Sequence, residues 1–215
     1  MEIQTESVEI PLDGGGSMGG YLARPAEGDA HPAILVFMEI FGVNSHIRDV
    51  TERIAREGYV ALAPDYFHRT SPGVELDYDD AGMAEGMKML GALTADEMTS
   101  DAGAALAFLR SRSEVRSDRI GATGFCIGGH MTYLTACATD IQVAASFYGG
   151  GIAAPRGPGG GASTVSRTPE IGGRIICFFG GQDAMIPQDQ VDVIRDALEA
   201  ASVSAEVIVY PDADH

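Results

Sequence analysis

The chain has 215 residues, a formal net charge of −17 at pH 7 and 45% hydrophobic residues. This length allows one well-buried core, so we expect a single domain over residues 1–215. The negative charge argues against nucleic acid and anionic membranes as partners. The sequence has no apolar run long enough to span a membrane and no signal-peptide pattern, and its three cysteines have no CxxC spacing. We therefore expect a cytoplasmic protein with free thiols.

The first third of the chain predicts a hairpin followed by two buried strands. The hairpin covers residues 8–12 and 20–23, around a glycine-rich loop. Continuous apolar runs at 33–38 and 59–63 are typical of strands buried on both faces. A helix is expected between them at 45–56, and a long polar loop follows at 68–80.

The remainder continues the alternation of helices and apolar strands. Helices are expected at 81–90, 95–112, 130–134 and 188–201, and strands at 120–123, 142–148, 174–179 and 205–210. A glycine-rich segment at 149–161 is interpreted as a flexible connection. Such alternation predicts an α/β fold with a mainly parallel central sheet, helices on both faces and no large cap domain. Ligands of such folds bind at the carboxyl ends of the strands.

The most specific motif is Gly124-Phe125-Cys126-Ile127-Gly128-Gly129, between a predicted strand and a predicted helix. A sharp strand-to-helix turn of this kind presents its central residue as a nucleophile. The dipole of the following helix stabilises a thiolate at that position. Cys126 is therefore the candidate nucleophile.

Two further residues complete a possible triad in the chain order nucleophile, acid, histidine. Asp183 follows the strand that ends at Phe179, and His215 follows the strand that ends at Tyr210. A thiol nucleophile needs a base, and the base needs a group that fixes its tautomer. The sequence leaves structural alternatives open: Asp183 could order its own turn, and a terminal histidine could belong to a frayed end.

The sequence also contains other carboxylates, thiols and histidines that could take these roles. Asp212 and Asp214 compete as partners of the histidine, although their proximity in sequence makes the geometry difficult. Cys137 and Cys177 are interpreted as small buried hydrophobic residues. The remaining histidines are expected on the surface or in loops, and His68, in the long loop, is kept as a candidate to line the pocket.

Six collinear motifs make the chain resemble the dienelactone hydrolase family of α/β-hydrolases. They are Met38-Glu39-Ile40-Phe41-Gly42-Val43-Asn44, Ala63-Pro64-Asp65-Tyr66, the Cys126 motif, Phe147-Tyr148-Gly149, Gly180-Gly181-Gln182-Asp183 and Asp214-His215. The resemblance implies an α/β-hydrolase fold and an ester or lactone hydrolase in which the thiol forms a thioester acyl-enzyme. It also implies a C-terminal helix beyond His215, which we expect the domain over residues 1–215 to lack.

The resemblance also assigns roles by motif. Glu39 corresponds to the glutamate that activates the thiol, with a structural ion pair as the alternative. The backbone N–H groups of Ile40 and Ile127 correspond to the oxyanion hole. No metal or cofactor is implied. The expected partner is a small ester or lactone, bound by a monomer or small homo-oligomer.

Substrate recognition departs from the family pattern. Where well-known members hold the substrate carboxylate with an arginine, this chain has Ala84, and Lys88 replaces a nearby tyrosine. His68, Arg69 and Lys88 are the candidate substitutes. The alternatives are a general small-ester carboxylesterase and a non-catalytic ligand-binding or redox-sensing protein. A glutamine-amidotransferase-like enzyme is disfavoured because Ile127, rather than histidine, follows Cys126.

Overall fold

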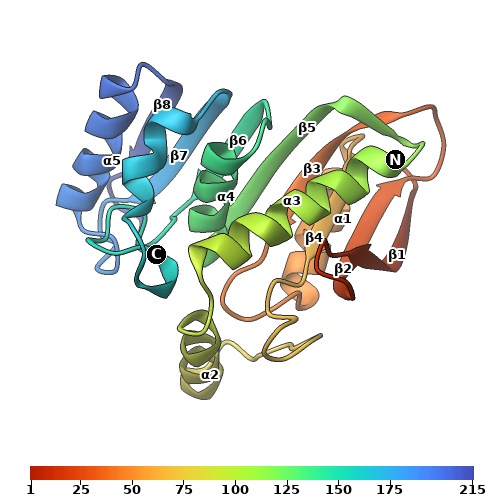
Figure 1. Ribbon diagram of the computed structural model, residues 1–215, viewed down its shortest axis with the longest axis horizontal. Coiled ribbons are helices and arrows are strands. Elements are labelled where there is room, and N and C mark those ends of the chain that lie inside the picture. The colour runs from red at the N-terminus through yellow and green to blue at the C-terminus, as the bar shows by residue number, and fades with distance from the viewer.

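The computed structural model describes residues 1–215 and contains one eight-stranded sheet (Figure 1). The strands lie in the order β1-β2-β4-β3-β5-β6-β7-β8. β1 and β2 form an antiparallel hairpin, β2 is antiparallel to β4, and the remaining pairs are parallel. The strands are β1 Ile3–Pro11, β2 Ser17–Pro25, β3 His31–Phe37, β4 Val60–Pro64, β5 Val115–Phe125, β6 Val143–Phe147, β7 Arg174–Gly180 and β8 Ser204–Tyr210.

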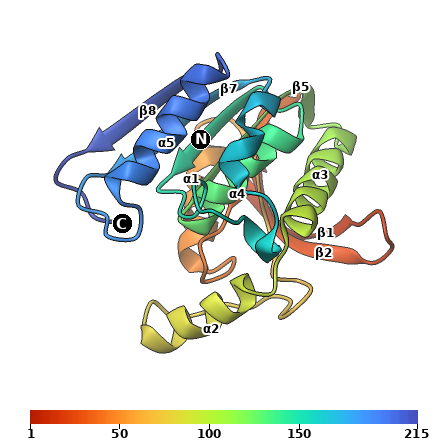
Figure 2. The same cartoon turned by 60° about the vertical axis from the view of Figure 1, so that its left-hand side comes forward.

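Helices cover both faces of the sheet, as the alternating pattern predicts. Figures 1 and 2 show α3, α4 and α5 on one side and α1 on the other. The helices are α1 Ser45–Arg56, α2 Asp80–Leu90, α3 Ala95–Ser111, α4 Ile127–Ala138 and α5 Gln188–Ala200. The buried side chains of sheet and helices form one continuous core. None of the helices is long and apolar enough to cross a membrane.

The segment 65–90, which ends with α2, extends away from the sheet. Figure 1 shows α2 standing apart, beyond the carboxyl ends of the central strands. Its start is capped by Asp79, whose carboxylate accepts a hydrogen bond from the Gly82 amide at 2.8 Å. α3 begins with a capping box in which Thr94 and Glu97 bond reciprocally.

The structure differs from the sequence-based expectations mainly at element boundaries. The hairpin strands and β5 are longer than predicted, because alternating or polar residues join the ladder once a neighbouring strand supplies partners. The glycine-rich segment contains one 3₁₀ turn, η1 Pro158–Gly160, and is followed by a second, η2 Thr164–Glu170; the sequence revealed neither. η2 packs against α4 and α5.

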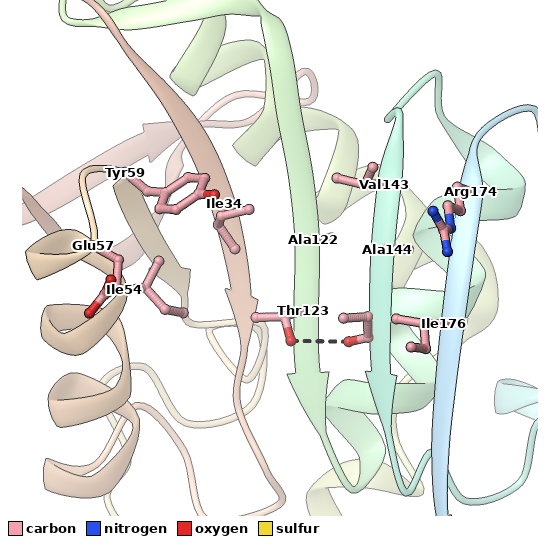
Figure 3. Close-up of a pocket in the computed structure, with 11 residues that line it drawn as sticks. Ile34, Ile54, Glu57, Tyr59, Ala122, Thr123, Val143, Ala144, Arg174 and Ile176 are labelled. Carbon is pink, nitrogen blue, oxygen red and sulfur yellow. Dashed lines mark hydrogen bonds between the residues drawn. The ribbon is translucent and has the colours of Figure 1, made fainter. Parts of the chain in front are cut away.

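A shallow apolar pocket of about 470 Å³ lies on the face of the sheet that carries α1. Figure 3 shows side chains of β3, β5, β6 and β7 pointing into it beside the end of α1. Val143 is 51% exposed there, so α1 leaves part of this face open. Cys126 is not among the lining residues. The pocket is thus separate from the candidate site at the strand ends.

Candidate active site

Cys126 occupies a strained turn between β5 and α4. Its φ and ψ angles are 56° and −121°, outside the regions that non-glycine residues usually adopt. The turn is held by a hydrogen bond of 3.1 Å from the Cys126 amide to the carbonyl of Phe147. Strain that the surrounding structure maintains is common at functional sites. The predicted strand–turn–helix context of the motif is confirmed.

The glycine after the turn brings β3 against α4. A Cβ atom built on Gly128 would lie 2.3 Å from the carbonyl oxygen of Phe37 and 2.5 Å from that of Met38. Only a residue without a side chain permits this approach. Because Glu39 directly follows these two residues, the close contact brings the Glu39 segment to the first turn of the helix that Cys126 begins.

Asp183 and His215 form a hydrogen-bonded pair after β7 and β8. Nδ1 of His215 lies 2.8 Å from Oδ2 of Asp183. The other carboxylate oxygen accepts hydrogen bonds from the amides of Met185 and Ile186, at 2.8 and 3.1 Å. The Asp183 side chain is fully buried, whereas the His215 side chain is 22% exposed. Asp183 therefore orders its own turn and also orients the imidazole.

The electrostatics of His215 link it to Cys126. Hydrogen bonding to Cys126 is the largest effect that raises the pKa of His215, to about 9. Hydrogen bonding to Asp183 also raises it, whereas burial opposes the shift. With Nδ1 held by Asp183, Nε2 is the ring nitrogen available to the thiol. Tyr148 packs beside this ring, edge to face, with centroids 4.9 Å apart.

Three tyrosines surround the strand end that carries Glu39. The hydroxyl of Tyr78 donates to Oε2 of Glu39 at 2.5 Å, and that of Tyr148 donates to Oε1 at 3.4 Å. The hydroxyl of buried Tyr66 donates at 2.5 Å to the carbonyl of Met38, the residue before Glu39. Burial, the Glu39 carboxylate and Cys126 raise the pKa of Tyr78 to about 12.

These tyrosines are site residues that the sequence analysis did not assign. Tyr66 and Tyr148 both lie in recognised motifs just after strands, which is the signal that could have singled them out. Tyr78 lies in the long loop, 39 residues from Glu39, and nothing in the sequence pairs the two.

Two backbone amides near the turn are available as donors. Ile127 is the first residue of α4, where an amide has no partner within the helix. The Ile40 amide makes no backbone hydrogen bond. Both side chains are buried, at 2% exposure for Ile40 and 6% for Ile127. Gly86 of α2 packs directly on the Ile40 carbonyl, so α2 supports the segment between β3 and α1.

The three candidate substrate-binding cations have partners of their own. Arg69 forms a two-pronged ion pair with buried Asp101 of α3, and His68 contacts the same carboxylate at 3.2 Å. Lys88 bonds to Glu85 on the exposed side of α2. None of these three residues forms a hydrogen bond or ion pair with Cys126 or His215.

The competing residues of the sequence analysis lie elsewhere. Asp212 is exposed, and Asp214 bonds to the His215 backbone amide rather than to its ring. Cys137 and Cys177 are buried, and burial raises the pKa of each thiol to about 12. His130 was expected at the surface or in a loop, but it is buried in α4, where it bonds to Gly150 and Thr164. No three His, Cys, Asp or Glu side chains cluster as metal ligands do.

The sheet order, the strained turn after β5 and the strand-end positions of Asp183 and His215 define an α/β-hydrolase. A family model described as "Dienelactone hydrolase family" matches residues 18–215. The chain belongs to the dienelactone hydrolase family. The resemblance found in the sequence is thereby confirmed.

Individual relatives agree with this assignment. The chain is 40% identical, over its full length and 87% of the relative, to a Synechocystis sp. protein named "Putative carboxymethylenebutenolidase". It is 28% identical to the "Carboxymethylenebutenolidase" of Pseudomonas putida, over 98% of this chain and 85% of that protein. A crystal structure described as a "Putative Dienelactone Hydrolase" from Klebsiella pneumoniae superposes with a TM-score of 0.88 and 32% identity, covering 100% of this chain and 88% of the other.

Proposed function

We propose that the protein hydrolyses small carboxylic esters or lactones through a thioester formed on Cys126. The observation that carries the proposal is the Asp183–His215 pair, linked to a thiol in a strained turn. The relatives named carboxymethylenebutenolidase support a lactone as one substrate. The exposure of the thiols also favours Cys126, which is half-buried, whereas Cys137 and Cys177 are buried and resist ionisation.

In the first half of the reaction, Cys126 loses its thiol proton to Nε2 of His215. The sulfur then attacks the carbonyl carbon, and the carbonyl π electrons move onto oxygen. The Ile40 and Ile127 amides are the proposed donors to this oxyanion. When the carbonyl re-forms, the C–O bond to the leaving group breaks. The imidazolium returns its proton to the leaving oxygen, and the acyl group remains on Cys126 as a thioester.

In the second half, His215 accepts a proton from water. The resulting hydroxide adds to the thioester carbonyl, and collapse of the intermediate breaks the C–S bond. The carboxylic acid product leaves, and the thiol is regenerated with the proton held by His215. Asp183 keeps Nδ1 protonated and oriented throughout, since its carboxylate lies 2.8 Å away.

Glu39 is proposed to assist this deprotonation when substrate binds, as a transient acceptor that takes the thiol proton and passes it to Nε2 of His215. Its carboxylate is held by the hydroxyls of Tyr78 and Tyr148. A negative charge near the sulfur disfavours an idle thiolate, which protects the thiol from unwanted reaction. Glu39→Gln is expected to slow acylation in pre-steady-state measurements without lowering the melting temperature, and unchanged acylation would remove Glu39 from the mechanism.

The proposed function leaves two substrate classes, those with a carboxylate and neutral ones. Arg69 is committed to Asp101, which argues against its use as a carboxylate anchor. Lys88 forms an exposed pair, which costs little to break, so Lys88 is the better cationic candidate. A panel of dienelactone, neutral lactones and neutral aryl esters tests this choice. Faster turnover of the neutral substrates would identify a general small-ester carboxylesterase with the same mechanism.

The decisive experiment compares Cys126→Ala with Cys137→Ala, which removes a buried thiol from α4. Cys126→Ala is expected to abolish ester hydrolysis, while Cys137→Ala retains it. Rapid quenching of the wild-type enzyme should give a covalent acyl adduct, located on Cys126 by mass spectrometry and removed by hydroxylamine. Full turnover by Cys126→Ala would reject the thiol mechanism. Ligand binding without any turnover by the wild type would favour the non-catalytic alternative.

A further inference from the structure

Tyr148, at the end of β6, has a backbone conformation that calls for an explanation. Its φ angle is +39°, in the left-handed region that bulky side chains rarely adopt. Glycine would occupy this position without strain, yet the chain has a tyrosine. A strained non-glycine residue next to a reactive centre indicates that its side chain is needed in a particular place.

The neighbouring backbone is held on two sides, which maintains the strain. The Tyr148 amide donates to the carbonyl of Phe178 in β7 at 2.8 Å. On the other side, a Cβ atom on Gly149 would lie 2.8 Å from backbone atoms of Gly129 and His130 in α4. His130 also bonds to the Gly150 carbonyl at 2.8 Å. The turn is therefore clamped between β7 and the first turns of α4.

This geometry places one side chain against two of the proposed catalytic groups. The phenol hydroxyl of Tyr148 reaches Oε1 of Glu39 at 3.4 Å. Its ring meets the imidazole of His215 at 4.9 Å between centroids, with an angle of 66° between the planes. Tyr78 holds the opposite oxygen of Glu39, but no hydrogen bond or ring pairing joins Tyr78 to His215.

The phenol can act toward Glu39 only as a donor. Burial first, and then the negative charges of Glu39 and Cys126, raise the pKa of Tyr148 well above its usual value of 10. The hydroxyl thus keeps its proton over the whole working range of a thiol enzyme.

We propose that Tyr148 is a positioning residue that holds the Glu39 carboxylate with its hydroxyl and the His215 imidazole with its ring. The proposal rests on the proposed function, because it assigns to Tyr148 the joint alignment of Glu39 and His215 relative to Cys126. The two contacts are separable by substitution. Phenylalanine removes the hydroxyl alone, and leucine removes both the hydroxyl and the aromatic ring.

The test uses Tyr148→Phe and Tyr148→Leu, with Tyr21→Phe as the matched control. The hydroxyl of Tyr21 donates to a glutamate in the same way, to Oε1 of Glu52 at 2.8 Å, but between β2 and α1. Tyr148→Phe is expected to lower kcat for an aryl ester about tenfold with little change in KM, and Tyr148→Leu to lower it about a hundredfold. Tyr21→Phe should leave both constants unchanged.

Two measurements that do not require turnover complete the test. Loss of the phenol leaves the Glu39 charge less compensated beside the thiol, so the rate of Cys126 alkylation by iodoacetamide at pH 7 should fall about threefold in Tyr148→Phe. In Tyr148→Leu, the NMR titration midpoint of His215, assigned by its loss in His215→Gln, should fall toward 6.5.

These readouts separate the two proposals. If the wild type hydrolyses no ester, the proposed function fails, while alkylation and titration still test Tyr148. Should Tyr148→Leu not fold, Tyr148→Phe alone decides through kcat and alkylation. An alkylation rate and a kcat in Tyr148→Phe that match those of Tyr21→Phe would overturn the positioning role.

Discussion

The imidazole of His215 and the carboxylate of Asp183 meet at 2.8 Å, although 32 residues separate them in the chain. The two residues follow adjacent parallel strands, β7 and β8, so their loops emerge at the same edge of the sheet. Burial of Asp183 and its two bonds from backbone amides fix the acceptor, and the histidine is oriented by it.

Asp183→Asn is expected to lower kcat/KM by about two to four orders of magnitude. The amide retains a carbonyl oxygen for the Met185 and Ile186 amides, so the turn should survive, but the orientation and tautomer of His215 are lost. Steady-state kinetics of ester hydrolysis measure the effect. Asp212→Asn, on an exposed neighbour of the histidine, should retain activity. Equal losses of kcat/KM in both variants would show that Asp183 is not the residue that orients His215.

The raised pKa of His215 makes a prediction about stability and pH. Because the fold raises this pKa from 6.5 to about 9, the folded state binds the His215 proton more tightly than the unfolded state does. The resulting contribution to stability is fully present below about pH 6.5 and disappears as the pH rises through about 9. Urea denaturation of the wild type and His215→Gln at pH 6 and 9.5 checks this. The difference in free energy of unfolding should shrink at the higher pH, and a growing difference would contradict the assignment.

Cys126→Ala tests the main cause of that shift. Hydrogen bonding to Cys126 is the largest effect that raises the pKa of His215. Its removal should therefore move the NMR titration of His215 down toward 6.5. Asp183 still raises the value in this variant, so the return should be incomplete. An unchanged titration would show that thiol and imidazole are not coupled.

Asp101→Ala is expected to destabilise the fold by about 3 kcal/mol. The carboxylate is 1% exposed and binds both Arg69 and His68, so its loss leaves the partly buried Arg69 with only the more distant Glu97, at 3.9 Å. Asp140→Ala, which breaks the exposed pair with Arg110, should change the free energy of unfolding by less than about 1 kcal/mol. Chemical denaturation of both variants provides the comparison. Similar small effects would mean that the Asp101 cluster does not anchor the loop at 65–79.

Gly128→Ala is expected to abolish activity and to destabilise the protein. The new methyl group would lie within 2.5 Å of the backbone carbonyl oxygens of Phe37, the last residue of β3, and Met38, so either the helix or the strand end must move. Gly103→Ala is the control, because nothing lies within 4 Å of its Cβ position in α3. That change should stabilise the protein by about 0.5–1 kcal/mol. Thermal melting and ester hydrolysis measure both, and an active, stable Gly128→Ala would refute the close-approach argument.

The candidate triad could be predicted because its members follow buried strands. Apolar runs such as 33–38 and 174–179 identify central strands by composition alone, and a parallel sheet brings their carboxyl ends together. The Cys126 motif identifies its own turn, since glycines are required on either side of it. The hydrogen bond between Asp183 and His215 is the structural relationship that this reasoning expects.

The tyrosines around Glu39 could not be predicted in the same way. Tyr78 reaches the carboxylate from a loop with no periodic pattern, and its position depends on the packing of α2 beneath Ile40. The partners of His68 and Arg69 were also hidden, because Asp101 looks like an ordinary polar position in α3 until the loop folds back onto it. Such contacts depend on tertiary packing rather than on local periodicity.

By itself, the sequence determined the α/β architecture, the strained turn at Cys126 and the order of the candidate triad. These depend on local signals: hydrophobic period, glycine spacing and the position of a residue relative to its own strand. Only the tertiary structure decided which side chains surround the reactive groups, above all Tyr148 between Glu39 and His215. Those contacts join the segments that follow β3, β6 and β8, and their distances are set by how the strands and α4 pack.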